Sequence, residues 1–203
     1  SGELGPVRKV VVEYPQGWLT EKLEDEGQKQ ATWRSDPAKA GKAGAYGDIG
    51  THAANMAEYV SGLPIIKVLS QMSKVVEGRL LDDDSSALLE FEGGVPGVLI
   101  CSQVSAGEEN ALKVKVYGTK GGVEWCQEDE NTLLVKRYGA PNQIYRTGVD
   151  NSYLAEAALV HARVPSGHPE GYLEAFANIY RNFAMGVRAH FSGSAHNPMY
   201  DFP

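Results

Sequence analysis

Asp48 and His52 are the residues of this sequence whose types and spacing could do chemistry, and they follow a run of glycines. Side chains four residues apart on a helix share one face, so both could reach one small ligand. Histidine exchanges protons readily near neutral pH, as a general base must. The spacing predicts that His52 takes a proton, while Asp48 hydrogen-bonds a neighbouring hydroxyl or orients the imidazole.

The same two residues also have a purely structural interpretation. Asp48 occupies the expected position of a helix N-cap, where a carboxylate accepts hydrogen bonds from unpaired backbone N–H groups. His52 would then pack in a half-buried interior. Glycines at this loop indicate a close approach of the backbone to a ligand or to another element; they are Gly41, Gly44, Gly47 and Gly50.

The composition argues against several classes of partner. The chain has 203 residues, a formal net charge of −7 and no basic cluster, which argues against nucleic acid and anionic membranes as partners. No apolar run is long enough to span a bilayer. Metal binding is not expected, because no His, Cys, Asp and Glu cluster has ligand spacing. Cys101 and Cys126 are interpreted as buried, reduced thiols of a cytoplasmic protein, in preference to a disulfide.

Hydrophobic patterns divide the chain into strands and two main helices. Residues 7–13 are a β-branched strand, and residues 19–32 are a mobile loop or a short helix. One amphipathic helix is expected from Asp48 to Ser61, and a long one from Glu170 to Phe191. Further strands are predicted at residues 65–77, 86–92, 97–105, 111–117, 122–126, 132–136 and 143–147. This order predicts an α+β domain with an open, mainly antiparallel sheet and helices packed on one face.

Two of these strands, 97–105 and 111–117, carry apolar residues on both alternations. A sheet with one face in water would alternate more cleanly between apolar and polar residues. One face is therefore expected to be covered by helices and the other by a neighbouring subunit. The apolar residues concerned are Leu99, Ile100, Val104, Leu112, Val114 and Val116.

Further residues are candidates for a substrate pocket. Aromatic faces and a planar guanidinium suit a polyol ring, and these candidates are Tyr14, Trp18, Trp33 and Arg34. The alternative is that each is an ordinary core or loop-anchoring residue. His168 and Glu170 could reach the pocket from the start of the last helix, although Glu170 also suits a first-turn acid. Residues 82–84, three aspartates, are interpreted as a solvated turn.

Several motifs in this order resemble those of one enzyme family. The motifs are Gly-Asp-Ile-Gly-Thr-His at 47–52, Asp82-Asp83, Ser-Gln-Val-Ser-Ala-Gly-Glu-Glu-Asn at 102–110, Val-Tyr-Gly-Thr-Lys-Gly-Gly at 116–122 and Gly-His-Pro-Glu-Gly-Tyr at 167–172. The chain closely resembles the C-terminal domain of the glucose–fructose oxidoreductase, inositol dehydrogenase and rhizopine catabolism (Gfo/Idh/MocA) family. The resemblance covers essentially the whole chain.

The resemblance implies a two-part enzyme. Members join an N-terminal Rossmann domain, which binds NAD or NADP, to a second domain with a large open sheet, similar to the C-terminal domain of glyceraldehyde-3-phosphate dehydrogenase. They oxidise or reduce hydroxyl or carbonyl carbons of sugars and cyclitols. The matching Asp48 and His52 would contact the substrate hydroxyls, with His52 as the acid/base. The sheet would face partner subunits, so a homodimer or homotetramer is expected.

The chain departs from the family pattern in three ways. It has no G-x-G-x-x-G fingerprint after an opening strand, no Glu-Lys-Pro motif, and no final helix after residues 200–203. We therefore expect residues 1–203 to be a single substrate-binding and oligomerisation domain that binds neither NAD nor NADP and is inactive alone. The alternative is a non-catalytic binding or assembly module that uses the open sheet for protein contact.

Overall fold

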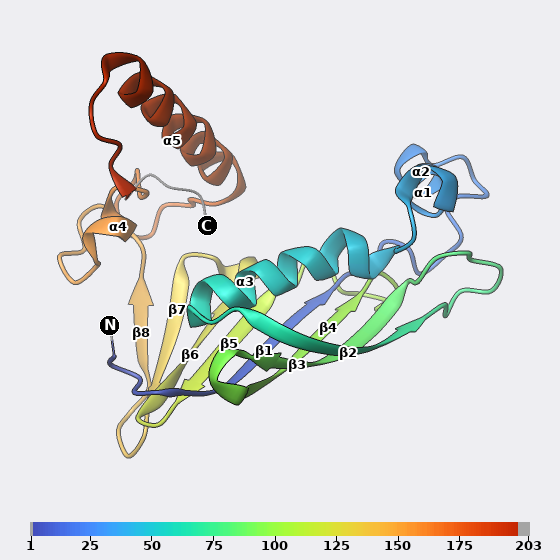
Figure 1. The fold of residues 1–203 in the computed structure, drawn as a ribbon, viewed down its shortest axis with the longest axis horizontal. Coiled ribbons are helices and arrows are strands. Elements are labelled where there is room, and N and C mark those ends of the chain that lie inside the picture. The colour runs from blue at the N-terminus through green and yellow to red at the C-terminus, as the bar shows by residue number, and fades with distance from the viewer. Residues whose placement is uncertain (1, 199–203) are drawn as a thin grey trace. The chain divides into compact units, whose positions relative to one another are not determined.

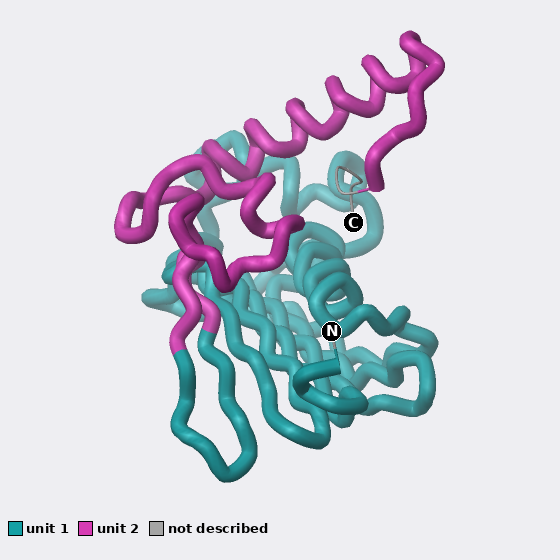
Figure 2. Tube along the Cα trace, turned by 90° about the vertical axis from the view of Figure 1, so that its left-hand side faces the viewer, with its two compact units in different colours: residues 1–129, 134–143 teal, residues 130–133, 144–203 magenta. Residues whose placement is uncertain are grey.

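The computed structural model describes residues 2–198 and divides the chain into two compact units (Figure 2). Unit 1 contains the chain up to residue 129 together with residues 134–143. Unit 2 contains residues 130–133 and the chain from residue 144 onward. The expected family segment at residues 200–203 lies outside the described residues.

An eight-stranded sheet runs through the fold in the order β2-β3-β4-β1-β5-β6-β7-β8. β1 pairs in parallel with β4 and antiparallel with β5, and the pairs β2–β3, β3–β4 and β5–β6 are antiparallel. The expected open, mainly antiparallel sheet is confirmed. The strands are β1 (Val7–Pro15), β2 (Ile65–Ser73), β3 (Asp84–Phe91), β4 (Val95–Ser102), β5 (Lys113–Gly118), β6 (Gly121–Cys126), β7 (Thr132–Arg137) and β8 (Gln143–Arg146).

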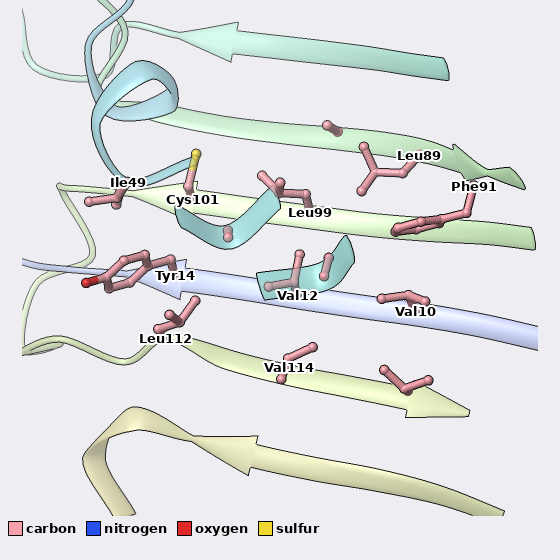
Figure 3. Packing of buried hydrophobic residues seen from close by; sticks show 14 residues of the cluster. Val10, Val12, Tyr14, Ile49, Leu89, Phe91, Leu99, Cys101, Leu112 and Val114 are labelled. Carbon is pink, nitrogen blue, oxygen red and sulfur yellow. The ribbon is translucent and has the colours of Figure 1, made fainter. Parts of the chain in front are cut away.

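Helix α3 (Thr51–Ser61) lies across one face of the sheet (Figure 1). It continues directly from a π-helical turn, Tyr46–Gly50. Ala53 and Ala57 of α3 are fully buried in the core, because a small side chain lets the helix backbone approach the strands closely. Beneath them lie alternate residues of the central strands, such as Val12 and Leu99 (Figure 3).

The face of the sheet opposite α3, here called the outer sheet face, is apolar at one end. The register places Leu69 of β2 beside Leu88 of β3, and Leu88 beside Val98 of β4. The exposed fractions of Leu69 and Leu88 are 72% and 61%. Towards β5 the same face becomes charged, because Glu13 lies 3.8 Å from Lys113 and 3.6 Å from Lys115. The prediction that residues 111–117 are apolar on both faces is therefore wrong, since these lysines alternate with the buried Val114 and Val116.

The three aspartates at residues 82–84 are not the solvated turn that the sequence predicts. Asp82 and Asp83 are 7% and 1% exposed, and Asp84 begins β3. The Asp83 carboxylate accepts hydrogen bonds from the backbone N–H groups of Val75, at 2.6 Å, and Val76, at 3.0 Å. These bonds turn the chain away from its pairing with β3, so β2 stops at Ser73 and does not reach residue 77.

Arg79 connects this turn to residues 21–24, in the loop that follows β1. Its side chain is 3% exposed and forms ion pairs with Glu24 at 3.0 Å and Asp83 at 3.2 Å. It also donates to the carbonyl oxygen of Glu21 at 2.9 Å. The segment leads into two short helices, α1 (Lys29–Arg34) and α2 (Pro37–Ala40), which agrees with the short-helix alternative for residues 19–32.

Both cysteines are free, as expected. Cys101 is buried, and desolvation raises the pKa of its thiol to about 12, so it stays protonated and unreactive near neutral pH. Cys126 is half-buried and not fully buried as predicted, because it stands at the end of β6.

Unit 2 contains α4 (Glu156–Leu159) and the long helix α5 (Tyr172–Ser192). At its start the Glu174 carboxylate accepts a hydrogen bond from the Gly171 N–H at 2.9 Å, so Glu174 is the first-turn acid. The predicted first-turn role of Glu170 is wrong, since this residue lies outside the helix and its carbonyl accepts from Asn131 at 2.9 Å. Within residues 2–198, no helix combines the length and apolar character needed to cross a membrane.

Candidate active site

The helix that carries the predicted pair begins earlier than its sequence indicates. Tyr46 opens a π-helical turn, and Asp48 lies inside it and not at an N-cap. The capping carboxylate is that of Asp82, which accepts from the N–H groups of Gly44 at 2.6 Å and Tyr46 at 2.7 Å. The predicted cap is therefore wrong, because a residue from a distant loop satisfies the free N–H groups.

The glycine-rich loop approaches another element closely, which is one of the two alternatives for its glycines. A Cβ atom at Gly44 would lie 2.1 Å from the carbonyl oxygen of Asp82, far inside van der Waals contact. Gly44 therefore allows Asp82 to reach the start of the helix. The Asp82 carbonyl also accepts from the N–H of Ala45 at 2.9 Å.

Because Asp82 caps the helix, the Asp48 carboxylate can bind other groups, and two side chains hold it. Its Oδ2 atom accepts from Arg34 Nε at 3.0 Å and from Gln103 Nε2 at 2.9 Å. About a third of the Asp48 side chain, 31%, is exposed. One oxygen is thus fixed by two donors, and the described structure gives Oδ1 no hydrogen bond, which leaves it able to accept from a ligand.

Arg34 is positioned by the residues around the end of α1. Its guanidinium carbon lies 4.4 Å from the centre of the Trp33 ring, a cation–π contact. Gln30 accepts hydrogen bonds from both the Trp33 indole, at 3.1 Å, and the Arg34 guanidinium. Trp33 and Arg34, both predicted for the pocket, therefore form one cluster beside Asp48.

His52 is exposed in the first turn of α3 and lies next to Tyr14 of β1. The two rings meet edge to face with their centres 6.5 Å apart. The Tyr14 hydroxyl donates to Asn110 Oδ1 at 2.7 Å. Among the described residues no hydrogen bond joins Asp48 to His52, so Asp48 does not orient the imidazole directly.

The loop that provides Gln103 and Asn110 has no regular secondary structure, but its backbone is bound to the segment after β1. Gln16 N–H donates to Ser102 O at 2.7 Å, and Ser105 N–H donates to Gln16 O at 3.0 Å. Gly17 N–H and Leu19 N–H donate to carbonyls of the same loop, at 2.8 and 2.9 Å. These backbone hydrogen bonds hold the loop in place and so position the side chains of Gln103 and Asn110.

Comparison with known proteins identifies the family of the chain. Residues 1–124 match the GFO/IDH/MocA C-terminal domain. This chain belongs to the Gfo/Idh/MocA oxidoreductase family. It is 32% identical over 194 residues to the uncharacterized oxidoreductase YfiI of Bacillus subtilis (strain 168), a match that covers 93% of this chain and 48% of that protein.

Solved structures of Gfo/Idh/MocA proteins have the same fold. An inositol dehydrogenase homolog from Azotobacter vinelandii, complexed with NAD+, superposes with a TM-score of 0.88 at 36% identity, covering 95% of this chain and 49% of that one. A further inositol dehydrogenase homolog structure from that organism, complexed with NADH and myo-inositol, gives a TM-score of 0.84 at 32% identity, with coverage of 95% and 48%. The chain spans about half the length of these relatives.

The site brings together most of the residues predicted from the sequence, of which Asp48 and His52 also match the Gfo/Idh/MocA motif. Asp48 and His52 share it with Tyr14, Arg34 and Trp33. Trp18 is connected to the site indirectly, because it donates a hydrogen bond to Gln16, which in turn donates to Asn110. The prediction that these residues bind substrate stays a prediction. His168 belongs to unit 2, where its ring Nδ1 lies 3.1 Å from the carbonyl oxygen of Pro165, and its approach to the substrate is likewise a prediction.

Sequence reasoning missed three residues that shape this Gfo/Idh/MocA site. Gln103 and Asn110 lie in the run 102–110, which carries the family resemblance but had no predicted role. Asp82 belongs to the Asp82-Asp83 motif, for which the sequence predicts only a solvated turn. The signal was an otherwise unexplained pattern of polar residues bordering predicted strands. Within residues 2–198 no group of three His, Cys, Asp or Glu side chains could hold a metal ion.

Proposed function

We propose that this chain is the substrate-binding half of an NAD(P)-dependent oxidoreductase that acts on hydroxyl or carbonyl groups of sugars or cyclitols. The observation that carries the proposal is the Asp48 carboxylate, fixed through one oxygen by Arg34 and Gln103 and placed four residues before the exposed His52. The related inositol dehydrogenase homolog with myo-inositol supports a polyol as the substrate class.

In this proposal the chain contributes the proton-transfer side of the reaction. Oxidation of an alcohol releases a hydride and a proton, and NAD or NADP would supply the hydride acceptor. His52 takes the hydroxyl proton as the carbonyl forms, and returns it in the reverse direction. Asp48 accepts a hydrogen bond from a neighbouring hydroxyl through Oδ1, which fixes the ring relative to His52.

The glycine-rich loop of this chain does not suit the pyrophosphate of a dinucleotide. A pyrophosphate binds at a helix N-terminus through free backbone N–H groups. In the glycine-rich loop the N–H groups of Gly44 and Tyr46 already donate to the Asp82 carboxylate, whose negative charge would also repel a phosphate. The chain is therefore proposed to bind neither NAD nor NADP by itself, and the cofactor would be held by residues outside it.

A substrate screen tests this function. The full-length protein should reduce NAD or NADP when supplied with one or more members of a panel of inositols and aldoses, and the 203-residue chain alone should bind neither dinucleotide in a calorimetric titration. Amino acids and simple aliphatic alcohols serve as the control panel, because they lack the ring of adjacent hydroxyls. Turnover limited to the control panel, or absent from both, would contradict the proposal, as would micromolar dinucleotide binding by the chain.

We also propose that the protein is cytoplasmic and assembles as a homo-oligomer through the outer sheet face. The exposed Leu69 and Leu88 lie side by side there, and exposed apolar patches of this kind mark protein interfaces. Assembly through this face also suits a non-catalytic module, which the substrate screen distinguishes.

Replacement of Leu88 by Arg should weaken this self-association, because a charge would be buried unpaired at the interface. Light scattering at micromolar concentration should change from a dimer or tetramer to a smaller species. Tyr59→Arg is the matched control, since Tyr59 is similarly exposed, at 66%, but lies on α3. Dissociation by the Tyr59 variant and not by the Leu88 variant would place the interface elsewhere.

A further inference from the structure

A short chain of hydrogen bonds connects Trp18 to the edge of the site. The Trp18 indole Nε1 donates to Gln16 Oε1 at 3.1 Å, and Gln16 Nε2 donates to Asn110 Oδ1 at 2.7 Å. The same Asn110 oxygen accepts from the Tyr14 hydroxyl at 2.7 Å, and the Tyr14 ring contacts His52. Two residues of the site, Tyr14 and His52, are thus linked to one tryptophan through the amides of Gln16 and Asn110.

The direction of every hydrogen bond in this series follows from the first one, which the Trp18 indole makes. An indole N–H can only donate, so the Gln16 oxygen must face Trp18. The Gln16 NH₂ group must then face Asn110, which fixes the Asn110 oxygen towards Gln16 and Tyr14. The Tyr14 hydroxyl must donate, because it shares that oxygen. Each amide orientation, normally ambiguous, is determined here by chemistry.

Two consequences follow for the site. The Tyr14 proton is engaged with Asn110, so Tyr14 does not compete with His52 as a proton donor. The Asn110 NH₂ group faces away from both partners, and among the described residues nothing accepts a hydrogen bond from it. Asn110 is exposed, so its amide presents N–H donors, and no acceptor, to whatever binds beside Tyr14.

We propose that Asn110 is a substrate-binding residue whose NH₂ group donates to a non-reacting oxygen of the polyol, and that Trp18 and Gln16 are positioning residues that fix this donor. The inference rests on the proposed function and specifies which group of the site donates a hydrogen bond to the substrate and which group accepts one. Asp48 accepts from one substrate hydroxyl, and Asn110 donates to another. A polyol ring carries several hydroxyls, so it offers both a donor for Asp48 and an acceptor for Asn110.

Two substitutions reverse the presented polarity without changing side-chain size. Asn110→Asp keeps an oxygen for Tyr14 and Gln16 but presents a second oxygen to the substrate. Gln16→Glu still accepts from Trp18 but now faces Asn110 with an acceptor, so the Asn110 amide must turn and present its own oxygen. A substrate hydroxyl can turn and donate to such an acceptor, whereas a fluorine in its place can only accept. Both variants should therefore reject a substrate that carries fluorine at this position, with kcat/KM for it falling about tenfold, mainly through a raised KM.

The test uses the full-length protein and the polyol turned over best in the screen, with derivatives in which one hydroxyl at a time is replaced by fluorine. In the wild-type protein fluorine should be tolerated at the position that Asn110 contacts and should cost about tenfold in kcat/KM at the position that donates to Asp48. In Asn110→Asp both positions should be costly. Trp18→Phe should show a smaller loss, because Gln16 can then adopt either orientation. Thr20→Ser is the control, because among the described residues this exposed hydroxyl donates only to the Gly17 carbonyl, three residues earlier in the loop after β1.

The outcomes distinguish a failure of this inference from a failure of the proposed function. If polyols are turned over but the fluorine penalties are equal in wild-type and Asn110→Asp, Asn110 does not bind substrate and the inference fails alone. An unchanged KM of Gln16→Glu for the fluorinated substrate, at an unchanged melting temperature, would also overturn it. If no polyol is turned over, the proposed function fails, and this inference fails with it.

Discussion

Replacement of His52 by Gln should lower kcat of the full-length enzyme by about 10²–10⁴-fold, the usual contribution of a general base. The amide of glutamine can hydrogen-bond a substrate hydroxyl but cannot accept its proton. Substrate binding should therefore change little. His52 is exposed and forms no hydrogen bond among the described residues, so the melting temperature should stay within a few degrees of wild type.

Asp48→Asn should behave differently from the histidine variant. The amide oxygen can still accept from Gln103, but the ion pair with Arg34, at 3.0 Å, is lost together with the negative charge. We expect KM to rise, with kcat/KM reduced about tenfold, and kcat to fall less than in His52→Gln. Steady-state kinetics with both variants separates the proton-transfer role from the binding role.

His190→Gln provides a matched control for the histidine substitution, because His190 is also exposed on a helix, α5, and is not one of the proposed site residues. Its kcat should equal that of the wild type. Normal turnover by His52→Gln would refute the catalytic role of this residue. A large fall in melting temperature for His52→Gln, with kcat restored at low temperature, would indicate the structural role that the sequence also allows.

Replacement of Arg79 by Met should destabilise the chain by about 3–5 kcal/mol, which is typical when one partner of a buried ion pair is removed. The Arg79 side chain is 3% exposed, and its partners Glu24 and Asp83 are 12% and 2% exposed. Methionine fills most of the volume but leaves both carboxylates without their cation. The free energy of unfolding, measured by urea denaturation followed by circular dichroism, checks the expectation.

Lys67→Met is the matched control for Arg79→Met. Lys67 pairs with Glu90 at 2.8 Å, but the two side chains are 70% and 39% exposed, and a surface pair of this kind contributes about 0–1 kcal/mol. Equal losses in the two variants would show that the Arg79 network is not a stabilising element of the fold. Arg79→Lys should fall between them, because the charge remains while the guanidinium fork is lost.

The fold class and the approximate position of each strand could be predicted from local sequence. The β-branched run at residues 7–13 became β1, and the amphipathic run that ends near Ser61 became α3. The pair Asp48 and His52 could also be found locally, because a spacing of four residues has the same meaning on any helix. These features depend on neighbours within a few residues.

The partners of the site residues were decided by the tertiary structure. Asp82 caps a helix 36 residues earlier in the chain, Gln103 holds Asp48 from 55 residues away, and Asn110 meets Tyr14 across 96 residues. The parallel pairing of β1 with β4 brings Tyr14 beside Cys101 and so places the loop after β4 against the segment after β1. Local patterns show which side chains could do chemistry, but contacts between distant loops depend on the order of strands in the sheet. That order follows from the packing of the whole chain, so the carboxylate that caps the helix and the amides that fix the site became evident only in the folded structure.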